Sequence, residues 1–203
     1  MSSMHTLFHK LTHSFDDSSS SSSTSSSSND EDEPARMLRI AFGHKSKVGK
    51  NHAATIVSDY IHSRGNHRVH QLAFAKPIYD ILWFTQHMAR MEYKKDRDFL
   101  IMVGEWAKKQ AGDAVWANVV EHDIECIDQS GHIIVTDVRF DAEVQMLKRQ
   151  GFHLVRIDRN VESFNGDEQL DTFTDWDDII INNGSIPEFN EKIIACVDRL
   201  LEL

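Results

Sequence analysis

Residues 38–61 constrain the fold of this chain more than any other stretch. They read LRIAFGHKSKVGKNHAATIVSDYI, in which a short apolar run ends at Gly43 and a polar loop ends with Gly49 and Lys50. The apolar residues that follow recur at the i, i+3, i+4, i+7 and i+8 positions of one helix face. They are Ala53, Ile56, Val57, Tyr60 and Ile61. The stretch therefore predicts a buried strand, a loop and an amphipathic helix in direct succession.

The loop between these two elements suits a phosphate chain. Glycine before a helix lets backbone N–H groups converge, the helix dipole adds partial positive charge, and Lys50 adds a full charge. The sequence approximates the phosphate-loop pattern G-x-x-x-x-G-K-[ST] but departs from it at both ends. His44 stands where the first glycine belongs, and Asn51 and His52 replace the hydroxyl residue that would hold magnesium. An ordinary strand-to-helix turn with a surface lysine is the alternative interpretation.

The composition excludes several classes of protein. With 203 residues, the chain is long enough for one domain with a core. Its net charge of −10 argues against a surface that coats nucleic acid. No apolar run approaches the ~20 residues of a membrane helix. Cys126 and Cys196 lie far from any C-x-x-C spacing, and the twelve histidines form no obvious ligand pattern. We therefore expect a reducing, cytoplasmic setting with no disulfide, metal cluster, nucleic-acid partner or membrane partner.

Residues 1–36 differ from the rest of the chain in composition. Serine fills positions 18–28 except for Thr24, and the acidic stretch 30–33 follows. Such a segment buries too little apolar surface to offset its chain entropy, so we expect a disordered tail. Serines followed by acids also suit an acid-directed kinase, which is an alternative role for the tail.

Strands and helices alternate over residues 37–203, the expected folded domain. We expect strands at 38–42, 69–75, 132–137, 152–157 and 179–181, and helices at 53–61, 77–88, 99–110, 115–127, 142–150 and 186–201. Continuous apolar strands alternating with helices predict an α/β fold, a parallel sheet covered by helices on both faces. The polar, acidic stretch 160–178 lacks apolar periodicity and is expected to be a mobile loop or lid. Residues 182–185 are expected to form a turn before the last helix, where Ser185 and Glu188 have the spacing of a capping box.

Charged residues follow two of the expected strands. Asp137 ends the strand 132–137, at the edge where open α/β sheets bind ligands, and Arg139 lies close behind it. Phosphoryl transfer requires cations and a metal ligand, which Lys50 and Asp137 would supply. An Asp137–Arg139 ion pair that caps the next helix is the alternative. Arg156 and Arg159 could likewise reach phosphates on closure of the lid, or lie at a solvated strand end.

The sequence Gly104-Glu105-Trp106 permits two interpretations. Glu105 and Trp106 could line a pocket for a base, or Trp106 could be a core residue.

Several ordered blocks resemble the deoxynucleoside monophosphate kinases of tailed phages and related viruses, P-loop proteins akin to adenylate kinase. The blocks are residues 42–55, 72–78, 97–118, 135–143 and 182–185. The block 135–143, which contains Thr-Asp-Val-Arg-Phe, is the closest match. The resemblance covers the chain from about residue 38 onward and implies the P-loop nucleoside monophosphate kinase fold.

The resemblance also implies transfer of the ATP γ-phosphate to a deoxynucleoside monophosphate with Mg²⁺, which supplies precursors for DNA. It assigns ATP binding to Gly43, His44, Lys45, Val48, Gly49, Lys50, Asn51 and His52. It assigns substrate binding to Arg97, Glu105, Trp106, Lys108, Asp137 and Arg139, catalysis to Lys50, Asp137, Arg139 and Arg159, and the metal to Asn51 and Asp137. A homodimer is an open alternative to a monomer.

The departures from the family pattern leave other functions open. Because Asn51 and His52 are poorer magnesium ligands than a carboxylate or hydroxyl, the enzyme would rely more on Asp137 or be weakened. One alternative is a P-loop kinase for another small acceptor, such as a nucleoside or dephospho-coenzyme A. Another is a nucleotide-binding protein without catalysis.

Overall fold

The computed structural model describes residues 37–65, 67–127, 131–162 and 169–202. The predicted disordered tail, residues 1–36, lies outside the described residues. In chain order the elements are β1 (Arg39–Gly43), α2 (Lys50–Arg64), β2 (Val69–Leu72), α3 (Lys76–Met88), α4 (Arg97–Ala111), α5 (Val115–Cys126), β3 (His132–Val138), α6 (Asp141–Arg149), β4 (His153–Asp158), β5 (Asp178–Ile181) and α7 (Ile186–Glu202). Within these described ranges, every helix is too short or too polar to cross a membrane.

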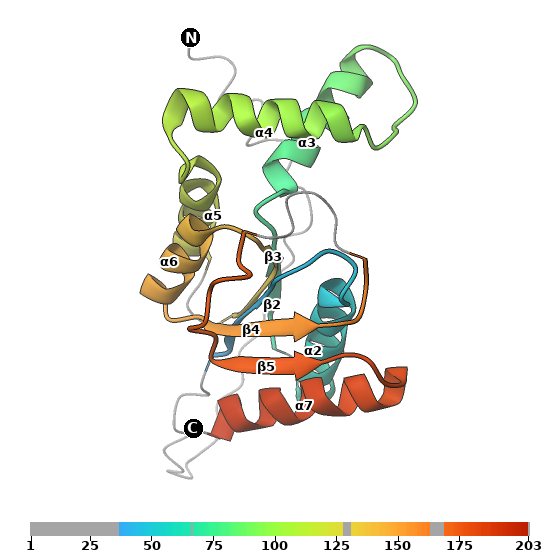
Figure 1. Ribbon diagram of the computed structural model, residues 1–203, viewed down its shortest axis with the longest axis vertical. Helices are drawn as coiled ribbons and strands as arrows, with labels where there is room; N and C mark the ends of the chain where they lie inside the picture. The colour runs from blue at the N-terminus through green and yellow to red at the C-terminus, as the bar shows by residue number, and fades with distance from the viewer. Residues whose placement is uncertain (1–36, 66, 128–130, 163–168, 203) are drawn as a thin grey trace, which may run out of the picture. The chain divides into compact units, whose positions relative to one another are not determined.

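The five strands form one parallel sheet in the order β2-β3-β1-β4-β5 (Figure 1). β1 is central, and its Ile40 pairs with Ile134 of β3 on one side and with His153 of β4 on the other. Most residues of β1 and β3 are buried, as expected for strands covered on both faces. The predicted α/β class and parallel sheet are confirmed.

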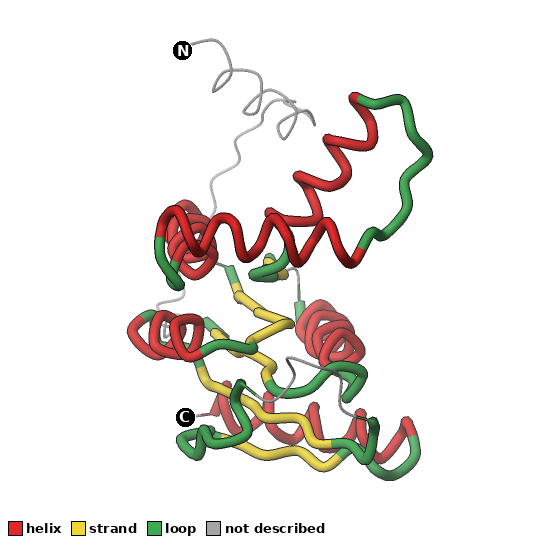
Figure 2. The backbone as a smooth tube through the Cα atoms, turned by 45° about the horizontal axis from the view of Figure 1, so that its top comes forward, coloured by secondary structure: helices red, strands yellow, loops and turns green. Residues whose placement is uncertain are grey.

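Helices cover both faces of the sheet (Figure 2). Because successive strand residues point to opposite faces, the core divides into two clusters. α2 and α7 pack on one face over Ile40, Phe42, Ile134, Val155 and Ile157. α5 and α6 pack on the other face over Ala41, Ile133, Val135 and Leu154.

Most helix and strand positions agree with the sequence pattern, but β2 ends earlier than expected. The prediction was 69–75, whereas the strand ends at Leu72. The cause lies in the next residues, since the N–H groups of Phe74 and Ala75 donate to the Asp137 carboxylate instead of to a neighbouring strand. The end of β3 is therefore tied to the turn that leads into α3.

The capping box predicted at the start of the last helix is present. Ser185 N donates to Glu188 Oε2 at 2.8 Å, and Glu188 N lies 3.4 Å from Ser185 Oγ. This turn follows β5 directly and lies beside the loop after β1, which it helps to position.

Candidate functional site

The loop between β1 and α2 presents backbone N–H groups at a helix start. α2 begins after Gly49, which has φ of 111° and no side chain with which to cap the helix. His44 and Lys47 also have positive φ, at 87° and 60°. Left-handed residues alternating with right-handed ones turn successive N–H groups toward a common point, and the helix dipole adds positive potential there. The loop geometry therefore suits an anion such as a phosphate.

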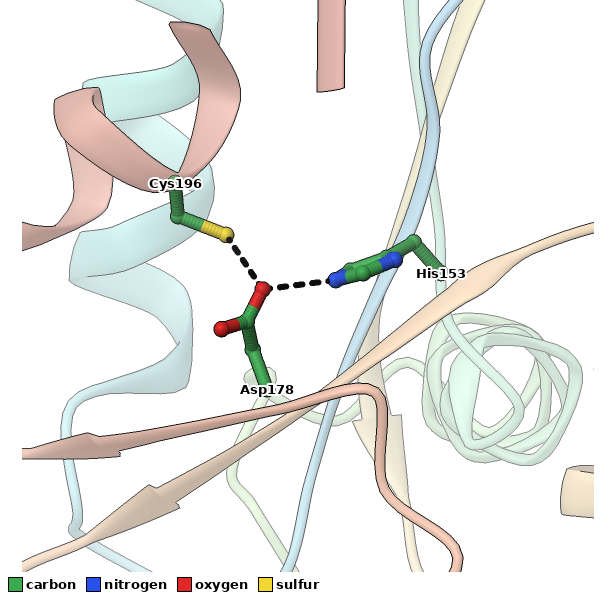
Figure 3. A group of neighbouring side chains, drawn as sticks. All are labelled: His153, Asp178 and Cys196. Carbon is green, nitrogen blue, oxygen red and sulfur yellow. Dashed lines mark hydrogen bonds and ion pairs between the residues drawn. The ribbon is translucent and has the colours of Figure 1, made fainter. Parts of the chain in front are cut away.

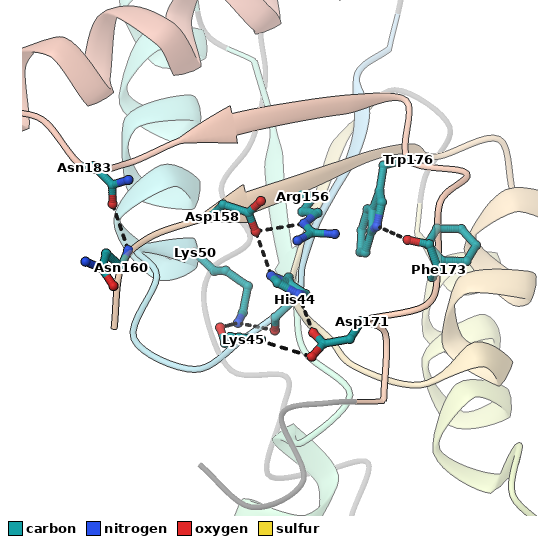
Figure 4. Close-up of polar contacts among 10 residues, drawn as sticks. All are labelled: His44, Lys45, Lys50, Arg156, Asp158, Asn160, Asp171, Phe173, Trp176 and Asn183. Atoms are coloured by element: carbon teal, nitrogen blue, oxygen red, sulfur yellow. Dashed lines mark hydrogen bonds and ion pairs between the residues drawn. The ribbon is translucent and has the colours of Figure 1, made fainter. Parts of the chain in front are cut away.

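Lys50 is the first residue of α2 and is only 7% exposed. Its ammonium group donates to the carbonyl oxygen of His44 at 2.9 Å and to that of Lys45 (Figure 4). The side chain thus folds back over the loop, which brings its charge against the loop backbone. The alternative of a surface lysine after an ordinary turn is wrong, because Lys50 is buried.

The turn after β5 fixes the position of the loop through a hydrogen bond. Val48 is buried, and its carbonyl oxygen accepts a hydrogen bond of 2.7 Å from Asn182 Nδ2. The backbone N–H of Asn182 in turn donates to Asp158 O at the end of β4. A side chain on Gly49 would meet Asn182 Nδ2 at 2.7 Å, so the glycine permits this close approach as well as its positive φ. Asn182 is a functional candidate that the sequence marked only as part of a turn.

His44 takes the place of the first glycine of the motif and lies between two carboxylates (Figure 4). Its Nε2 lies 2.9 Å from Asp171 Oδ1, and its Nδ1 lies 2.9 Å from Asp158 Oδ1, an ion-pair distance without hydrogen-bond alignment. Lys45 also approaches Asp171, at 3.3 Å. The hydrogen bond with His44 lowers the pKa of Asp171 below its usual value. His44 therefore joins the loop to β4 and to the segment before β5.

Three residues of the expected lid, Leu170, Phe173 and Trp176, pack against the core cluster on the α5–α6 face of the sheet. Leu170 is 1% exposed, and Trp176 lies so close to Gly43 that a side chain at that glycine would collide with the ring. Trp176 Nε1 donates to Phe173 O at 3.1 Å. Gly43 is thus required by the close approach of Trp176. Residues 163–168 lie outside the described residues, and the lid remains a prediction.

Two adjoining clefts open at the carboxyl ends of β1 and β3. The first, of about 840 Å³, is lined by the loop residues Ser46, Lys47, Gly49, Lys50, Asn51 and His52. The second, of about 500 Å³, lies against α3, α4 and α5. Both are lined by Ser46, Ala75, Tyr79, Lys95, Arg97, Asp137 and Arg139. Because the clefts share these lining residues, which we call the shared wall, ligands bound in the two clefts would lie next to each other.

Asp137 belongs to this shared wall, and it connects the end of β3 to the residues that follow β2. Its two carboxylate oxygens accept from Phe74 N at 2.8 Å and from Ala75 N at 3.0 Å. Burial raises the pKa of Asp137, while these two N–H groups, Arg139 and Lys50 act in the opposite direction. Each oxygen keeps a further lone pair for a second donor or a metal.

Glu143 caps the helix that follows β3. Its Oε2 accepts from Arg139 N at 2.7 Å and from Phe140 N at 3.0 Å. Burial and, to a smaller extent, the nearby Asp137 raise the pKa of Glu143 to about 8. Glu143 lines the second cleft and was not among the predicted site residues. Its position three residues after Phe140 was the available signal, since glutamate favours the third position of a helix.

The second cleft combines cations with aromatic rings. Lys108 Nζ lies 3.8 Å from the centre of the Phe140 ring and 3.3 Å from Glu105 Oε1. Trp116 Nε1 donates to Gly104 O at 3.3 Å, and its indole lines the cleft. Of the residues predicted for the substrate, Arg97, Glu105, Lys108, Asp137 and Arg139 line this cleft.

Trp106 is the exception, and both of its predicted placements need correction. It is 63% exposed, so it is not a core residue, and it is not among the residues that line either cleft. The cleft side of α4 carries residues 97, 100, 101, 104, 105 and 108, at the spacing of one helix face. Residue 106 falls on another side of the helix. Trp116 of α5 supplies the indole, which the sequence had marked only as an apolar helix position.

The remaining predicted residues are divided between the cleft and its surroundings. Asn51 is exposed and lines the loop cleft together with Asp137. His52 Nε2 lies 2.8 Å from Asn190 Oδ1, and its ring stacks on Phe189. Arg156 Nε donates to Asp158, and the exposed Arg159 lines neither cleft. The structure therefore brings together Lys50, Asn51, Asp137 and Arg139, but not Arg159.

Comparisons with known proteins agree in part with the resemblance seen in the sequence. No protein-family model matches the chain. A protein of Acanthamoeba polyphaga mimivirus named "Putative deoxynucleotide monophosphate kinase" is 31% identical over 75 residues, 35% of this chain. The match spans 39% of the viral protein. The resemblance to viral deoxynucleoside monophosphate kinases is thus confirmed over about a third of the chain.

Two solved structures found in the comparison have low sequence identity to this chain. The APS kinase of Mycobacterium tuberculosis, solved with AMPPNP and APS, is 15% identical with a TM-score of 0.48, over 81% of this chain and 99% of that one. The dephospho-CoA kinase of Campylobacter jejuni is 13% identical with a TM-score of 0.44, over 82% and 98%.

Proposed function

We propose that this protein transfers the γ-phosphoryl group of ATP to a deoxynucleoside monophosphate and so supplies precursors for DNA. The observation that carries the proposal is the pair of adjoining clefts with a shared wall of Arg97, Asp137 and Arg139. One cleft has the geometry for a phosphate chain, and the other has cations and aromatic rings for a second nucleotide. The partial similarity to the viral protein supports this choice of acceptor.

The loop cleft would hold the phosphates of ATP. The backbone N–H groups at the start of α2 would donate to the phosphate oxygens, and Lys50 would exchange its carbonyl contacts for them. Because the loop is fixed by Asn182 and His44, its N–H groups need little rearrangement when charge develops.

The second cleft would hold the monophosphate. Arg97 and Arg139 lie in the wall nearest the loop, so they would face the acceptor phosphate. The rings of Trp116, Phe140 and Tyr79 line the same cleft and would contact the base and sugar. This arrangement directs an oxygen of the acceptor phosphate toward the loop.

In the reaction, an oxygen of the acceptor phosphate forms a bond to the γ-phosphorus as the bond to the bridging oxygen of ADP breaks. The chain's contribution is the positioning of both phosphates and the cations around the transferred group. Bound Mg²⁺ would neutralise charge on the phosphates. Asn51 and Asp137 fit that ion, because both line the loop cleft and present a carbonyl and a carboxylate oxygen.

The test is an ADP-release assay with ATP, Mg²⁺ and each of the four deoxynucleoside monophosphates in turn. We expect ADP release that depends on at least one of them, with the matching diphosphate as product. Turnover with only a nucleoside or dephospho-coenzyme A would favour the other acceptor class. ATP binding without turnover of any acceptor would favour a nucleotide-binding protein without catalysis.

A further inference from the structure

A histidine, an aspartate and a cysteine meet at the opposite edge of the sheet from the clefts (Figure 3). His153 opens β4, Asp178 opens β5, and Cys196 lies in α7. His153 Nε2 lies 2.8 Å and Cys196 Sγ 3.5 Å from the same oxygen, Asp178 Oδ2. The three potential ligand atoms all lie within 4.8 Å of one another. The loop cleft plays no part in this cluster, since it lies at the carboxyl ends of the strands.

We propose that His153, Asp178 and Cys196 bind a Zn²⁺ ion, with water as the fourth ligand. Imidazole nitrogen, carboxylate oxygen and thiolate sulfur are the three ligand types of zinc in proteins. Thiolate and imidazole together favour zinc over magnesium or calcium, which prefer oxygen. The ion would join the two edge strands to the last helix.

The two distances to the shared oxygen, Asp178 Oδ2, are close to those between the ligands of a tetrahedral ion. Bond lengths of about 2.0 Å to nitrogen and oxygen and about 2.3 Å to sulfur place ligand atoms roughly 3.3–3.6 Å apart. The 3.5 Å between Cys196 Sγ and Asp178 Oδ2 already has this value. The 2.8 Å between His153 and Asp178 is a hydrogen bond that would have to widen by roughly 0.5 Å.

The surroundings of the cluster prepare the carboxylate for a metal. Arg199 Nη2 donates to Asp178 Oδ1 at 2.9 Å, which leaves Oδ2 directed toward the imidazole and the thiol. Outer hydrogen bonds of this kind orient the ligands of metal sites. The charges also match, because a thiolate and a carboxylate neutralise the two charges of the ion.

Protonation of the thiol makes metal binding dependent on pH. Burial and the adjacent Asp178 together raise the pKa of Cys196 to about 12 in the metal-free protein. Binding would therefore release the thiol proton, so the affinity would rise with pH. His153 and Asp178 are each about a quarter exposed, which gives an ion a path to the cluster.

The experiment is a titration of the full chain with Co²⁺, in the presence of excess Mg²⁺, followed by absorption. Co²⁺ replaces zinc in such sites, and a thiolate ligand produces a charge-transfer band that nitrogen and oxygen ligands do not. The band therefore separates this cluster from the loop cleft and from the histidines at positions 5, 9 and 13. We expect a saturable band with one ion per chain that Zn²⁺ abolishes.

Variants identify the ligands. Cys196→Ser should remove the band, and His153→Gln and Asp178→Asn should each weaken Co²⁺ binding by more than ~10-fold. Cys126→Ser is the matched control, because Cys126 is the chain's other thiol and lies 3.8 Å from His122 Nε2. It should keep the band.

Two outcomes would overturn the proposal. One is the absence of a band in the folded wild-type chain, which would leave the cluster as a hydrogen-bond network. The other is a band that survives Cys196→Ser and disappears in Cys126→Ser. Circular dichroism shows whether each variant is folded, and the wild-type result decides the question even where a variant is not. Neither outcome bears on the proposed kinase activity, which uses other residues.

Discussion

The loop between β1 and α2 forms one side of the candidate site, and the helices α3 and α4 form the other. The two sides differ in the exposed fraction of their side chains. In and beside the loop, Val48 is 1% exposed and Lys50 7%. On α3 and α4, Trp83 is 51% exposed, Met102 58% and Trp106 63%. The buried residues of α4 are only Gly104 and Ala107. The loop is therefore anchored in the core through Val48 and Lys50, whereas α3 and α4 bury only a few of their residues.

This difference in burial fits the roles that the loop and the two helices would have in the proposed reaction. Groups that stabilise developing charge are most effective when they are already in place, which the buried loop provides. Elements with few buried apolar contacts open at low free-energy cost, so α3 and α4 have the freedom to admit and enclose an acceptor. Four variants test the two sides, in order of decreasing expected effect.

The largest effect is expected from Lys50→Ala, which removes the buried charge from the loop. Turnover should fall by at least ~100-fold, because one preorganised donor at a developing charge is worth about 2.7–4 kcal/mol. Steady-state ADP release measures it. Lys109→Ala, at an exposed position of α4 outside both clefts, should retain normal turnover. Near-normal turnover of Lys50→Ala would contradict the role of the loop.

Glu143→Gln tests the buried carboxyl in the wall of the acceptor cleft. The usual pKa of 4.5 rises to about 8 in the folded protein, so between these values the folded state binds more protons than the unfolded state. Stability from this group is therefore complete below about pH 4.5 and is lost as the pH rises toward 8, at about 1.4 kcal/mol per pH unit at most.

Glu143→Gln has no titratable group at this position. Its free energy of unfolding relative to wild type should therefore increase by roughly 2 kcal/mol between pH 6 and pH 7.5. Urea denaturation at both pH values measures the change. Parallel pH profiles for the two proteins would show that Glu143 is ionised throughout.

Asn182→Ala tests the support beneath the loop. It leaves the buried carbonyl of Val48 without its hydrogen bond, which costs about 1.5 kcal/mol. Thermal unfolding measures the loss as a lower Tm. Asn183→Ala is the matched control, because Asn183 accepts its hydrogen bond from the exposed Asn160 N–H and not from the loop. Equal effects of the two substitutions would contradict a special role for Asn182.

Trp116→Ala tests the acceptor side and should have the smallest effect. Loss of an indole that contacts a base costs about 1–3 kcal/mol, so the KM for the monophosphate should rise ~10-fold with the KM for ATP unchanged. Trp106→Ala on the exposed side of α4 should change neither constant by more than about twofold. If Trp106→Ala raises the KM and Trp116→Ala does not, the assignment of the cleft is wrong.

The alternation of strands and helices was predictable, because it follows from local periodicity and capping. Ser185 and Glu188 lie three residues apart and form the expected capping box in the structure. Helix period also explains the failure at Trp106. Glu105 lines the cleft and Trp106 does not, and neighbouring helix residues point about 100° apart. The sequence could not indicate which of them would face the cleft.

By itself, the sequence determined the parallel α/β sheet and the order of strand, loop and helix from residue 38 onward. Each follows from residues close together in the chain. Tertiary structure alone decided that Asn182 supports Val48 and that His44 meets Asp171, pairs that lie 134 and 127 positions apart. It also joined His153, Asp178 and Cys196, where the sequence had indicated no metal cluster. Such contacts depend on the strand order β2-β3-β1-β4-β5, which places distant segments side by side and leaves no local pattern in the chain.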